Sequence, residues 1–188
     1  MKQIKTILKQ LSSEITDEDL NPLVQKWIHK KTLKRFEHLS VQGKVENMLY
    51  FINKGIFRTY ITTNEVEEDE LFAYSGSFYC SYISFLNQLP AQNNLQALAK
   101  AEVIGIKRDD FYSIIEKNQK LERLWRQQTE RLLIQRVERA LLLRTSSIEK
   151  VKSLLEKNPE IFQLLPHKYI ASYLHMSPAT LSRVLKKL

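Results

Sequence analysis

The sequence predicts an α+β protein in which a β-barrel with flanking helices is followed by a long helix and then by a pair of short helices. Three observations predict this fold class. Residues 33–108 alternate with a period of two between turn signals, residues 109–146 contain neither glycine nor proline, and residues 147–188 form short helical segments. A chain of 188 residues is long enough for two modest domains.

The first part of the chain predicts two entry helices and then a set of strands. Apolar residues recur at helical spacing from Ile4 to Leu11, and Thr16, followed by three acidic residues, marks the start of a second helix. Short runs rich in Val, Ile, Tyr and Phe follow, and they suggest an all-β barrel or sandwich across about 33–108. The runs are 48–53, 57–62, 70–74, 95–100 and 103–107.

An acidic segment, residues 65–70, falls between two of these strands. Carboxylates this close repel one another and prefer water, so we interpret the segment as a solvated hairpin tip. A metal-binding loop is the alternative, but the segment lacks the glycine and the Asp/Asn spacing of a calcium loop.

Residues 109–146 predict one long helix, because helix-forming residues dominate and no helix breaker occurs. At about 1.5 Å per residue its length would exceed about 50 Å, more than one small domain can cover. We therefore expect part of its apolar stripe to contact a second copy of the chain; a helix packed wholly within one subunit is the alternative. The residues expected on the dimer side are Leu121, Leu124, Trp125, Leu132 and Val137.

The positive charge of the chain lies in its second part. Up to Ile115 there are fourteen Lys and Arg against fourteen Asp and Glu, whereas fifteen against seven follow, which places the whole net charge of +8 there. Clustered cations release counterions from a phosphate backbone, so this distribution favours a nucleic-acid-binding part beside a neutral part. A solvated basic helix is the alternative.

Two short helices near the C-terminus have the pattern of a helix-turn-helix. Ser177 is a good N-cap and Pro178 a good first helical residue, so the start of the second helix is marked twice. In a helix-turn-helix the N-terminal residues of the second helix face the base edges, and Arg183 is the strongest candidate reader because it can contact guanine twice. The expected base-facing residues are Ser177, Pro178, Ala179, Ser182 and Arg183, and the expected phosphate-facing residues are Lys168, Tyr169, Thr180, Lys186 and Lys187.

Residues 170–183, I-A-S-Y-L-H-M-S-P-A-T-L-S-R, closely resemble the I-A-x-x-L-G-[IV]-S-P-E-T-L-S-R helix-turn-helix of the Crp/Fnr family of bacterial transcription regulators. Residues 48–58 resemble the Y-F-I-x-x-G-x-x-R strand pair of that family, and residues 74–78 resemble its x-x-G-x-F turn. The resemblance implies a jelly-roll barrel like a cyclic-nucleotide-binding domain, a dimerisation helix and a winged helix-turn-helix. The corresponding boundaries are 1–115 for the sensor domain, 116–146 for the dimerisation helix and 147–188 for the DNA-binding domain.

The sequence departs from the family pattern at the ligand pocket and in the helix-turn-helix. Cys80 and Ser81 stand where members that bind cyclic AMP have a Gly-Glu pair, and Ala91 and Gln92 stand where they have an Arg-Ser pair; with Phe78 these residues mark the expected pocket. Without a cation at position 91 the burial of a phosphate would be strongly unfavourable. In the helix-turn-helix, His175 replaces a glycine of the turn, which predicts modest strain, and Ala179 replaces a glutamate, which predicts a different or looser operator.

Motifs of other functional classes are absent from the sequence. The four glycines are too widely spaced for a phosphate-binding loop, the single Cys80 excludes an internal disulfide and a cysteine-ligated cluster, and no histidine pair has H-E-x-x-H spacing. We therefore expect no enzymatic activity, no metal and no cofactor. Lysines interrupt the first apolar residues and no run approaches about 18 apolar residues, so we expect a soluble cytoplasmic protein without a membrane partner.

The sequence thus predicts a homodimeric, sequence-specific regulator that binds double-stranded DNA, does not respond to cyclic AMP and has RNA polymerase as a candidate partner. The alternative is a barrel that senses an uncharged or apolar small molecule and so controls DNA binding; the effector itself is unknown. Aromatic residues are the candidates for such a pocket, although ordinary core packing explains them as well. They are Phe72, Tyr74, Phe78, Tyr79, Tyr82 and Phe85.

Overall fold

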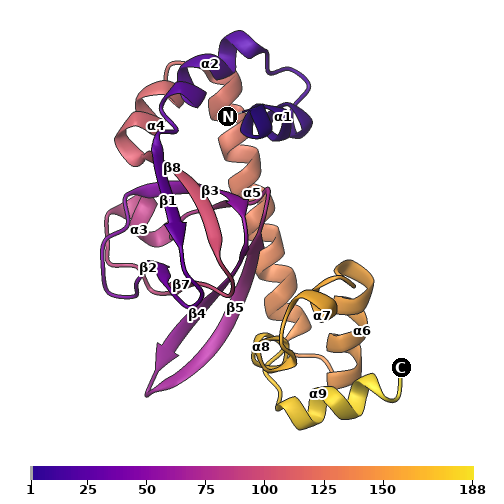
Figure 1. The fold of residues 1–188 in the computed structure, drawn as a ribbon. Helices are drawn as coiled ribbons and strands as arrows, with labels where there is room; N and C mark the ends of the chain where they lie inside the picture. Colours follow the sequence, from indigo (N-terminus) through magenta and orange to yellow (C-terminus); the bar gives the residue numbers. More distant parts are fainter. Residues whose placement is uncertain (1) are drawn as a thin grey trace. The chain divides into compact units, whose positions relative to one another are not determined.

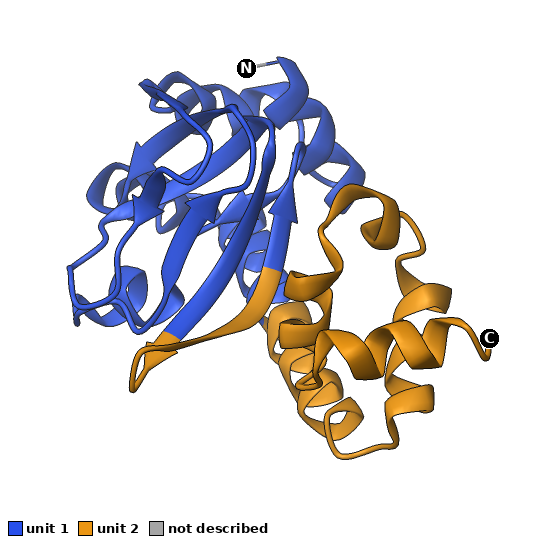
Figure 2. Ribbon diagram, turned by 60° about the horizontal axis from the view of Figure 1, so that its bottom comes forward, with its two compact units in different colours: residues 1–61, 72–129 blue, residues 62–71, 130–188 orange. Residues whose placement is uncertain are grey.

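The computed structural model describes residues 2–188, and the chain divides into two compact units (Figure 2). Unit 1 comprises the described residues up to Ile61 together with Phe72–Thr129. Unit 2 comprises Thr62–Leu71 and Glu130–Leu188. The boundary therefore crosses a β-hairpin and a long helix.

The strands form two four-stranded sheets, so of the two alternatives, barrel or sandwich, the domain is a β-sandwich and not the expected β-barrel (Figure 1). One sheet has the order β1-β8-β3-β6 and the other β2-β7-β4-β5, and no strand pairing between described residues joins them. Side chains from two inner faces fill the space between such sheets without closure. The strands are β1 His29–Leu33, β2 His38–Ser40, β3 Met48–Lys54, β4 Ile56–Thr63, β5 Val66–Tyr74, β6 Phe78–Tyr79, β7 Asn94–Ala97 and β8 Ala101–Lys107.

Unit 1 has two apolar cores, one on each face of the β1-β8-β3-β6 sheet. In β3, Tyr50 and Ile52 belong to the core that also contains residues of the opposite sheet, whereas Leu49 and Phe51 belong to the core that contains helix residues. Successive side chains of a strand point to opposite faces, so a strand buried on both faces reads as a continuous apolar run.

Gly55 makes the tight turn between β3 and β4 possible. Its φ is +110°, and a Cβ at this position would lie 2.6 Å from the Cβ of Ala101. Only glycine tolerates both the conformation and the close approach, which accounts for the glycine in the strand-pair motif.

Helices cover one side of unit 1 and include the first part of the long helix. They are α1 Lys2–Leu11, α2 Asp17–Gln25, α3 Tyr82–Asn87, α4 Arg108–Ile115 and α5 Gln119–Leu142. The prediction of one helix over 109–146 is therefore wrong, since α4 and α5 are separate. Asn118 causes the break, because its Oδ1 accepts hydrogen bonds from the backbone N–H groups of Lys120 and Leu121, at 3.0 and 3.2 Å.

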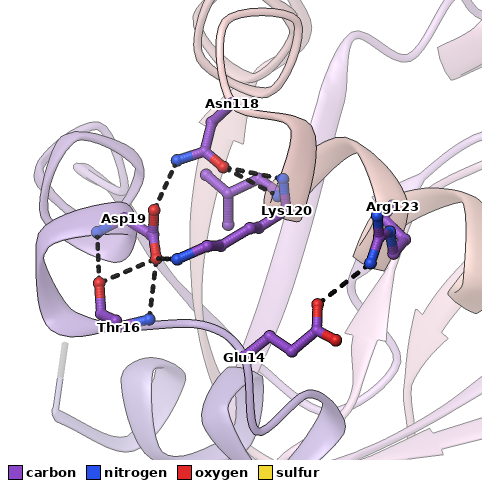
Figure 3. A network of polar contacts seen from close by, with 7 residues as sticks. Glu14, Thr16, Asp19, Asn118, Lys120 and Arg123 are labelled. Atoms are coloured by element: carbon purple, nitrogen blue, oxygen red, sulfur yellow. Dashed lines mark hydrogen bonds and ion pairs between the residues drawn. The ribbon is translucent and has the colours of Figure 1, made fainter.

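A polar network fixes the start of α5 to the start of α2 (Figure 3). Thr16 and Asp19 form a capping box at α2, as the sequence predicts for this helix start. The Asp19 carboxylate also accepts hydrogen bonds from Asn118 Nδ2 at 2.9 Å and Lys120 Nζ at 3.1 Å. These hydrogen bonds lower the pKa of Asp19, with the Thr16 backbone N–H as the largest contribution.

Unit 2 contains the second part of α5 and four short helices, which are α6 Ser147–Lys157, α7 Ile161–Leu164, α8 His167–Tyr173 and α9 Pro178–Leu185. The described residues after Lys107 contain no strand, so the wing implied by the family resemblance is absent from them. A wing needs two paired strands, and none of the residues from 147 to 188 lies in a strand.

The β4–β5 hairpin turns at Asn64 and Glu65, which have φ values of 49° and 65°. Positive φ at both central residues is typical of the two-residue turns that match the twist of a hairpin. The predicted hairpin is confirmed, but only Glu65 of the acidic segment lies in its turn, since residues 66–70 belong to β5, and not all of the acidic side chains are solvated. Asp69 is only 1% exposed.

Candidate functional site

Helices α8 and α9 form a compact pair around a small apolar core. Ile170 and Leu174 on the first segment and Leu181 and Val184 on α9 are all buried. The connection is closed by a hydrogen bond from the Met176 backbone N–H to the Ala171 carbonyl, 3.0 Å long. All four side chains are apolar, so their burial stabilises the packing of the two helices.

The start of α9 is capped as the sequence predicts. Ser177 has extended backbone angles, and its Oγ accepts a hydrogen bond from the Thr180 N–H at 3.1 Å. Pro178 occupies the first turn, where its missing N–H leaves no unmet donor. The N-terminus of α9 is therefore well defined.

The candidate base-reading residues are all exposed. They are Ser177, Pro178, Ala179, Ser182 and Arg183. Arg183 forms no ion pair with any described residue, so its guanidinium is available to an external acceptor. The buried Leu181 and Val184 anchor the opposite side of the same helix.

The candidate phosphate-facing residues differ in their surroundings. Lys168, Lys186 and Lys187 are exposed, whereas Thr180 shares the cap of α9 with Ser177. Tyr169 is 7% exposed, which corrects its expected place on the surface. Its ring supports Lys168, whose Nζ lies 4.7 Å from the ring centroid.

His175 occupies the turn between α8 and α9 with a φ of 50°, so the expected left-handed conformation is confirmed. The N–H of His175 donates to the Ser172 carbonyl at 3.0 Å. Burial lowers the pKa of His175, and the positive charge of Arg139 lowers it further. Both effects disfavour the protonated imidazole.

The five residues of the predicted ligand pocket differ in their surroundings. Cys80 and Ser81 are buried, Ala91 is buried, and Gln92 is exposed. Cys80 belongs to the core beneath the helices, where burial raises the pKa of its thiol. Phe78 packs against the same core, with its ring centroid 5.1 Å from that of Phe51.

Ala91 places a methyl group where a phosphate-binding member of the family would have an arginine. It is 2% exposed, and its backbone is paired on both sides with the 43–44 segment. The Gly43 N–H donates to the Ala91 carbonyl at 2.8 Å, and the Ala91 N–H donates to the Lys44 carbonyl at 2.9 Å. The segment is thus held rigidly and offers no cation at this position.

Several of the aromatic pocket candidates pack against the start of α5. The ring of Tyr82 stacks on that of Trp125 at 6.2 Å, and Phe85 meets Trp125 and Phe111 edge to face. These contacts agree with the alternative in which the aromatic residues are ordinary core. Of the remaining candidates, Phe72 and Tyr79 are buried, and Tyr74 is exposed.

Sequence reasoning missed Glu46, which precedes β3. Its carboxylate accepts a hydrogen bond from the Met48 N–H at 3.0 Å and lies 3.4 Å from the Tyr50 hydroxyl. Burial raises the pKa of Glu46. No motif contains this residue; the only signal was a single acidic residue immediately before an apolar strand.

Helix α5 has two distinct parts. Leu121 and Leu124 lie in the core of unit 1, and Trp125 packs against that core, so their expected place in a dimer surface is wrong. The reason is that the α2 and α4 segments cover this end of the helix. Leu132 is half-buried and Val137 is exposed. Leu133, Ile134, Val137 and Leu141 form the exposed apolar stripe of the second part.

Comparison with known proteins agrees with this architecture. Residues 30–118 match the family model of the cyclic nucleotide-binding domain. FixK2 from Bradyrhizobium japonicum is similar in structure over 85% of this chain and 83% of its own, with a TM-score of 0.72 and 19% identity. The chain has the fold of the Crp/Fnr-family regulators.

Other Crp/Fnr-like structures show the same likeness. The catabolite activator protein of Thermus thermophilus matches 95% of this chain and 85% of its own, with a TM-score of 0.60 and 20% identity. The sensor domain of the transcriptional regulator DNR from Pseudomonas aeruginosa matches 72% of this chain and 95% of its own, with a TM-score of 0.55 and 15% identity. No curated protein matches by sequence. Within residues 2–188 no helix is long and apolar enough to cross a membrane.

Proposed function

We propose that this chain is a homodimeric, sequence-specific DNA-binding transcription regulator of the Crp/Fnr type. The observation that carries the proposal is the exposed first part of α9, whose capped N-terminus and unpaired Arg183 stand on a buried apolar support. A side chain that reads bases must be exposed, held by a rigid helix and free of internal partners. Arg183 meets all three conditions.

The charge of the C-terminal part supports the same function. Residues 130–188 contain eleven Lys and Arg against five Asp and Glu. Exposed Lys186 and Lys187 follow the reading residues directly and can contact phosphates, which position a protein on DNA without reading its sequence. The proposed division of labour is a sensor domain at 1–115, a dimerisation helix at 116–146 and a DNA-binding domain at 147–188.

The exposed stripe on α5 supports a homodimer. Leu133, Ile134, Val137 and Leu141 are each more than half exposed, at 65%, 57%, 52% and 59%. Apolar side chains at this spacing on one helix gain free energy when a second copy of the helix covers them. The DNA site of such a dimer is a pseudo-palindrome with half-sites about 34 Å apart.

The regulator does not respond to cyclic AMP. The buried methyl group of Ala91 offers no positive charge to a cyclic phosphate, and the paired backbone of this segment resists rearrangement. A thermal-shift measurement with cyclic AMP tests this, because a ligand that binds the folded state raises the melting temperature. We expect no shift; stabilisation by cyclic AMP would contradict the proposal. The proposed regulator acts in the cytoplasm and contacts RNA polymerase.

Binding of the full-length protein to random-sequence and selected duplex DNA, measured by fluorescence anisotropy against salt concentration, tests the function. Affinity should fall steeply and linearly with salt on logarithmic axes, because phosphate contacts release counterions. If the protein binds no duplex at low salt, or if its DNA affinity does not depend on salt concentration, it is not a DNA-binding regulator.

Arg183→Ala and Lys187→Ala form a matched pair of variants. Arg183→Ala should cost about 1–3 kcal/mol at the selected site and relax the preference at one base step, because a bidentate base contact is lost. Lys187→Ala should weaken all sequences equally and reduce the salt slope. If both variants lose affinity equally for all DNA sequences, Arg183 does not read a base.

A further inference from the structure

The tip of the β4–β5 hairpin is an acidic part of the basic unit. Residues 62–71 lie in unit 2 and contain five carboxylates and no lysine or arginine (Figure 2). Residues 130–188 carry a formal charge of +6, so the hairpin lowers the charge of the whole unit to +1. A unit that binds a polyanion thus contains a segment that almost cancels its charge.

Hydrogen bonds between side chains and backbone groups clip this hairpin to the last turn of α8. The Asp69 N–H donates to Ser172 Oγ at 2.9 Å, and the Ser172 hydroxyl donates to the Glu67 carbonyl at 3.5 Å. Arg139 Nη2 donates to the carbonyls of both Asp69 and Tyr173, at 3.0 and 3.1 Å. The guanidinium also lies 4.7 Å from the centroid of the Tyr173 ring. Ser172 and Arg139 therefore hold the two segments together.

The clip leaves acidic side chains on the surface beside the helix pair. The clip uses backbone N–H and carbonyl groups of the hairpin, and the side chains of Glu65 and Glu68 are exposed. The ion pair of Glu70 with Arg136, at 4.0 Å, is at the limit of such contacts. The negative charge of Glu68 raises the pKa of His175, against the larger effects of burial and Arg139, and His175 lies in the turn that leads into α9.

We propose that the 62–71 hairpin is an autoinhibitory clip: it is held on α8 by Ser172 and Arg139, and its exposed carboxylates repel DNA phosphates and lower the affinity of the unit for DNA. The inference rests on the proposed DNA-binding function. Fixed negative charge near a cationic surface reduces its potential and slows the approach of a polyanion. The effect is screened by salt, since the Debye length falls from about 30 Å at 0.01 M to about 8 Å at 0.15 M.

The same contacts could instead support α8 mechanically, and the two roles predict opposite signs. If the hairpin only supports the helix pair, its release loosens α8 and weakens DNA binding. If it inhibits, its release strengthens DNA binding. Ser172→Ala separates the two roles, because alanine is a better helix former than serine and leaves α8 intact while it removes the Oγ.

The experiment compares Ser172→Ala with Ser153→Ala, the same substitution on α6, in the full-length protein. Amide hydrogen exchange of residues 67–71 should become at least about tenfold faster in Ser172→Ala alone, because the Asp69 N–H loses its acceptor. DNA affinity at low salt should rise about threefold or more in Ser172→Ala and stay unchanged in the control. Weaker binding by Ser172→Ala would overturn the inference.

A second pair of variants tests the charge while it leaves the clip in place. Glu65→Gln with Glu68→Gln should tighten DNA binding at low salt, and the gain should vanish as salt rises. Glu156→Gln with Glu160→Gln removes two exposed charges elsewhere in unit 2 and should have a smaller effect. If the wild type binds DNA but neither pair differs from its control, the clip is not inhibitory. A wild type that binds no DNA at any salt overturns the proposed function, and this inference with it.

Discussion

The two parts of α5 have similar sequences and opposite environments. In unit 1, Leu121 and Leu124 are 2% and 5% exposed and lie in a core with residues of α2 and α4. In unit 2, Leu133 and Val137 are 65% and 52% exposed, although they continue the same run of helix-forming residues. One helix thus serves as core at its start and presents an apolar surface further along.

The difference shows that apolar periodicity identifies a face but not what covers it. Burial of apolar area contributes about 25 cal/mol per Å², so both parts of the helix gain free energy when other residues cover their apolar side chains. Residues of the same chain supply the cover for the first part. We infer that a second copy supplies it for the second part.

Leu124→Ala should cause the largest effect, a loss of about 2–5 kcal/mol in the free energy of unfolding, because a fully packed side chain leaves a cavity. Urea denaturation followed by circular dichroism measures it. Glu122→Ala, exposed on the same part of the helix, should change stability by less than about 0.5 kcal/mol. Similar losses for the two variants would show that the first part of α5 is not core.

Val137→Glu should have the next largest effect and separate the dimer into monomers. A charge buried in an apolar contact lacks compensation, so the dissociation constant should rise by about a hundredfold or more. Sedimentation velocity over a range of concentrations measures this. Gln135→Glu adds the same charge on the opposite side of the helix and should leave the dimer intact. A Val137→Glu dimer of unchanged affinity would assign the exposed stripe to another role.

Asp19→Asn should have the smallest effect, and the effect should depend on pH. The folded protein lowers the pKa of Asp19, chiefly through the Thr16 N–H and Asn118, so the ionised form contributes stability at neutral pH. This contribution is present above the unfolded pKa of about 3.9 and is lost as the pH falls below it. The variant should therefore be less stable than the wild type at pH 7. This difference in stability should disappear at acidic pH.

Thermal unfolding of the Asp19→Asn variant and the wild type between pH 2.5 and pH 7 checks this sign. Glu18→Gln, on the exposed side of the same helix, is the control and should follow the wild type at every pH. A constant gap across the pH range would mean that the carboxylate charge contributes nothing to the attachment of α5.

Local features of this protein were predictable from the sequence alone. The cap at Ser177, the capping-box start at Thr16 and the hairpin tip after Thr63 depend on hydrogen bonds and turn angles within a few residues. The absence of a cation at position 91 is likewise a property of one residue, Ala91. Such features need no knowledge of distant parts of the chain.

Other features were decided only by the tertiary structure. Asn118 accepts the hydrogen bonds that begin α5, and its Nδ2 donates to Asp19, 99 positions away, in a contact that no local pattern contains. The buried Asp69 donates its backbone N–H to Ser172, 103 positions further on. Two sheets can stack or close into a barrel with the same strand pattern, and the packing of their inner faces decides between them. Periodicity and caps are local, whereas burial results from contacts between residues far apart in the sequence.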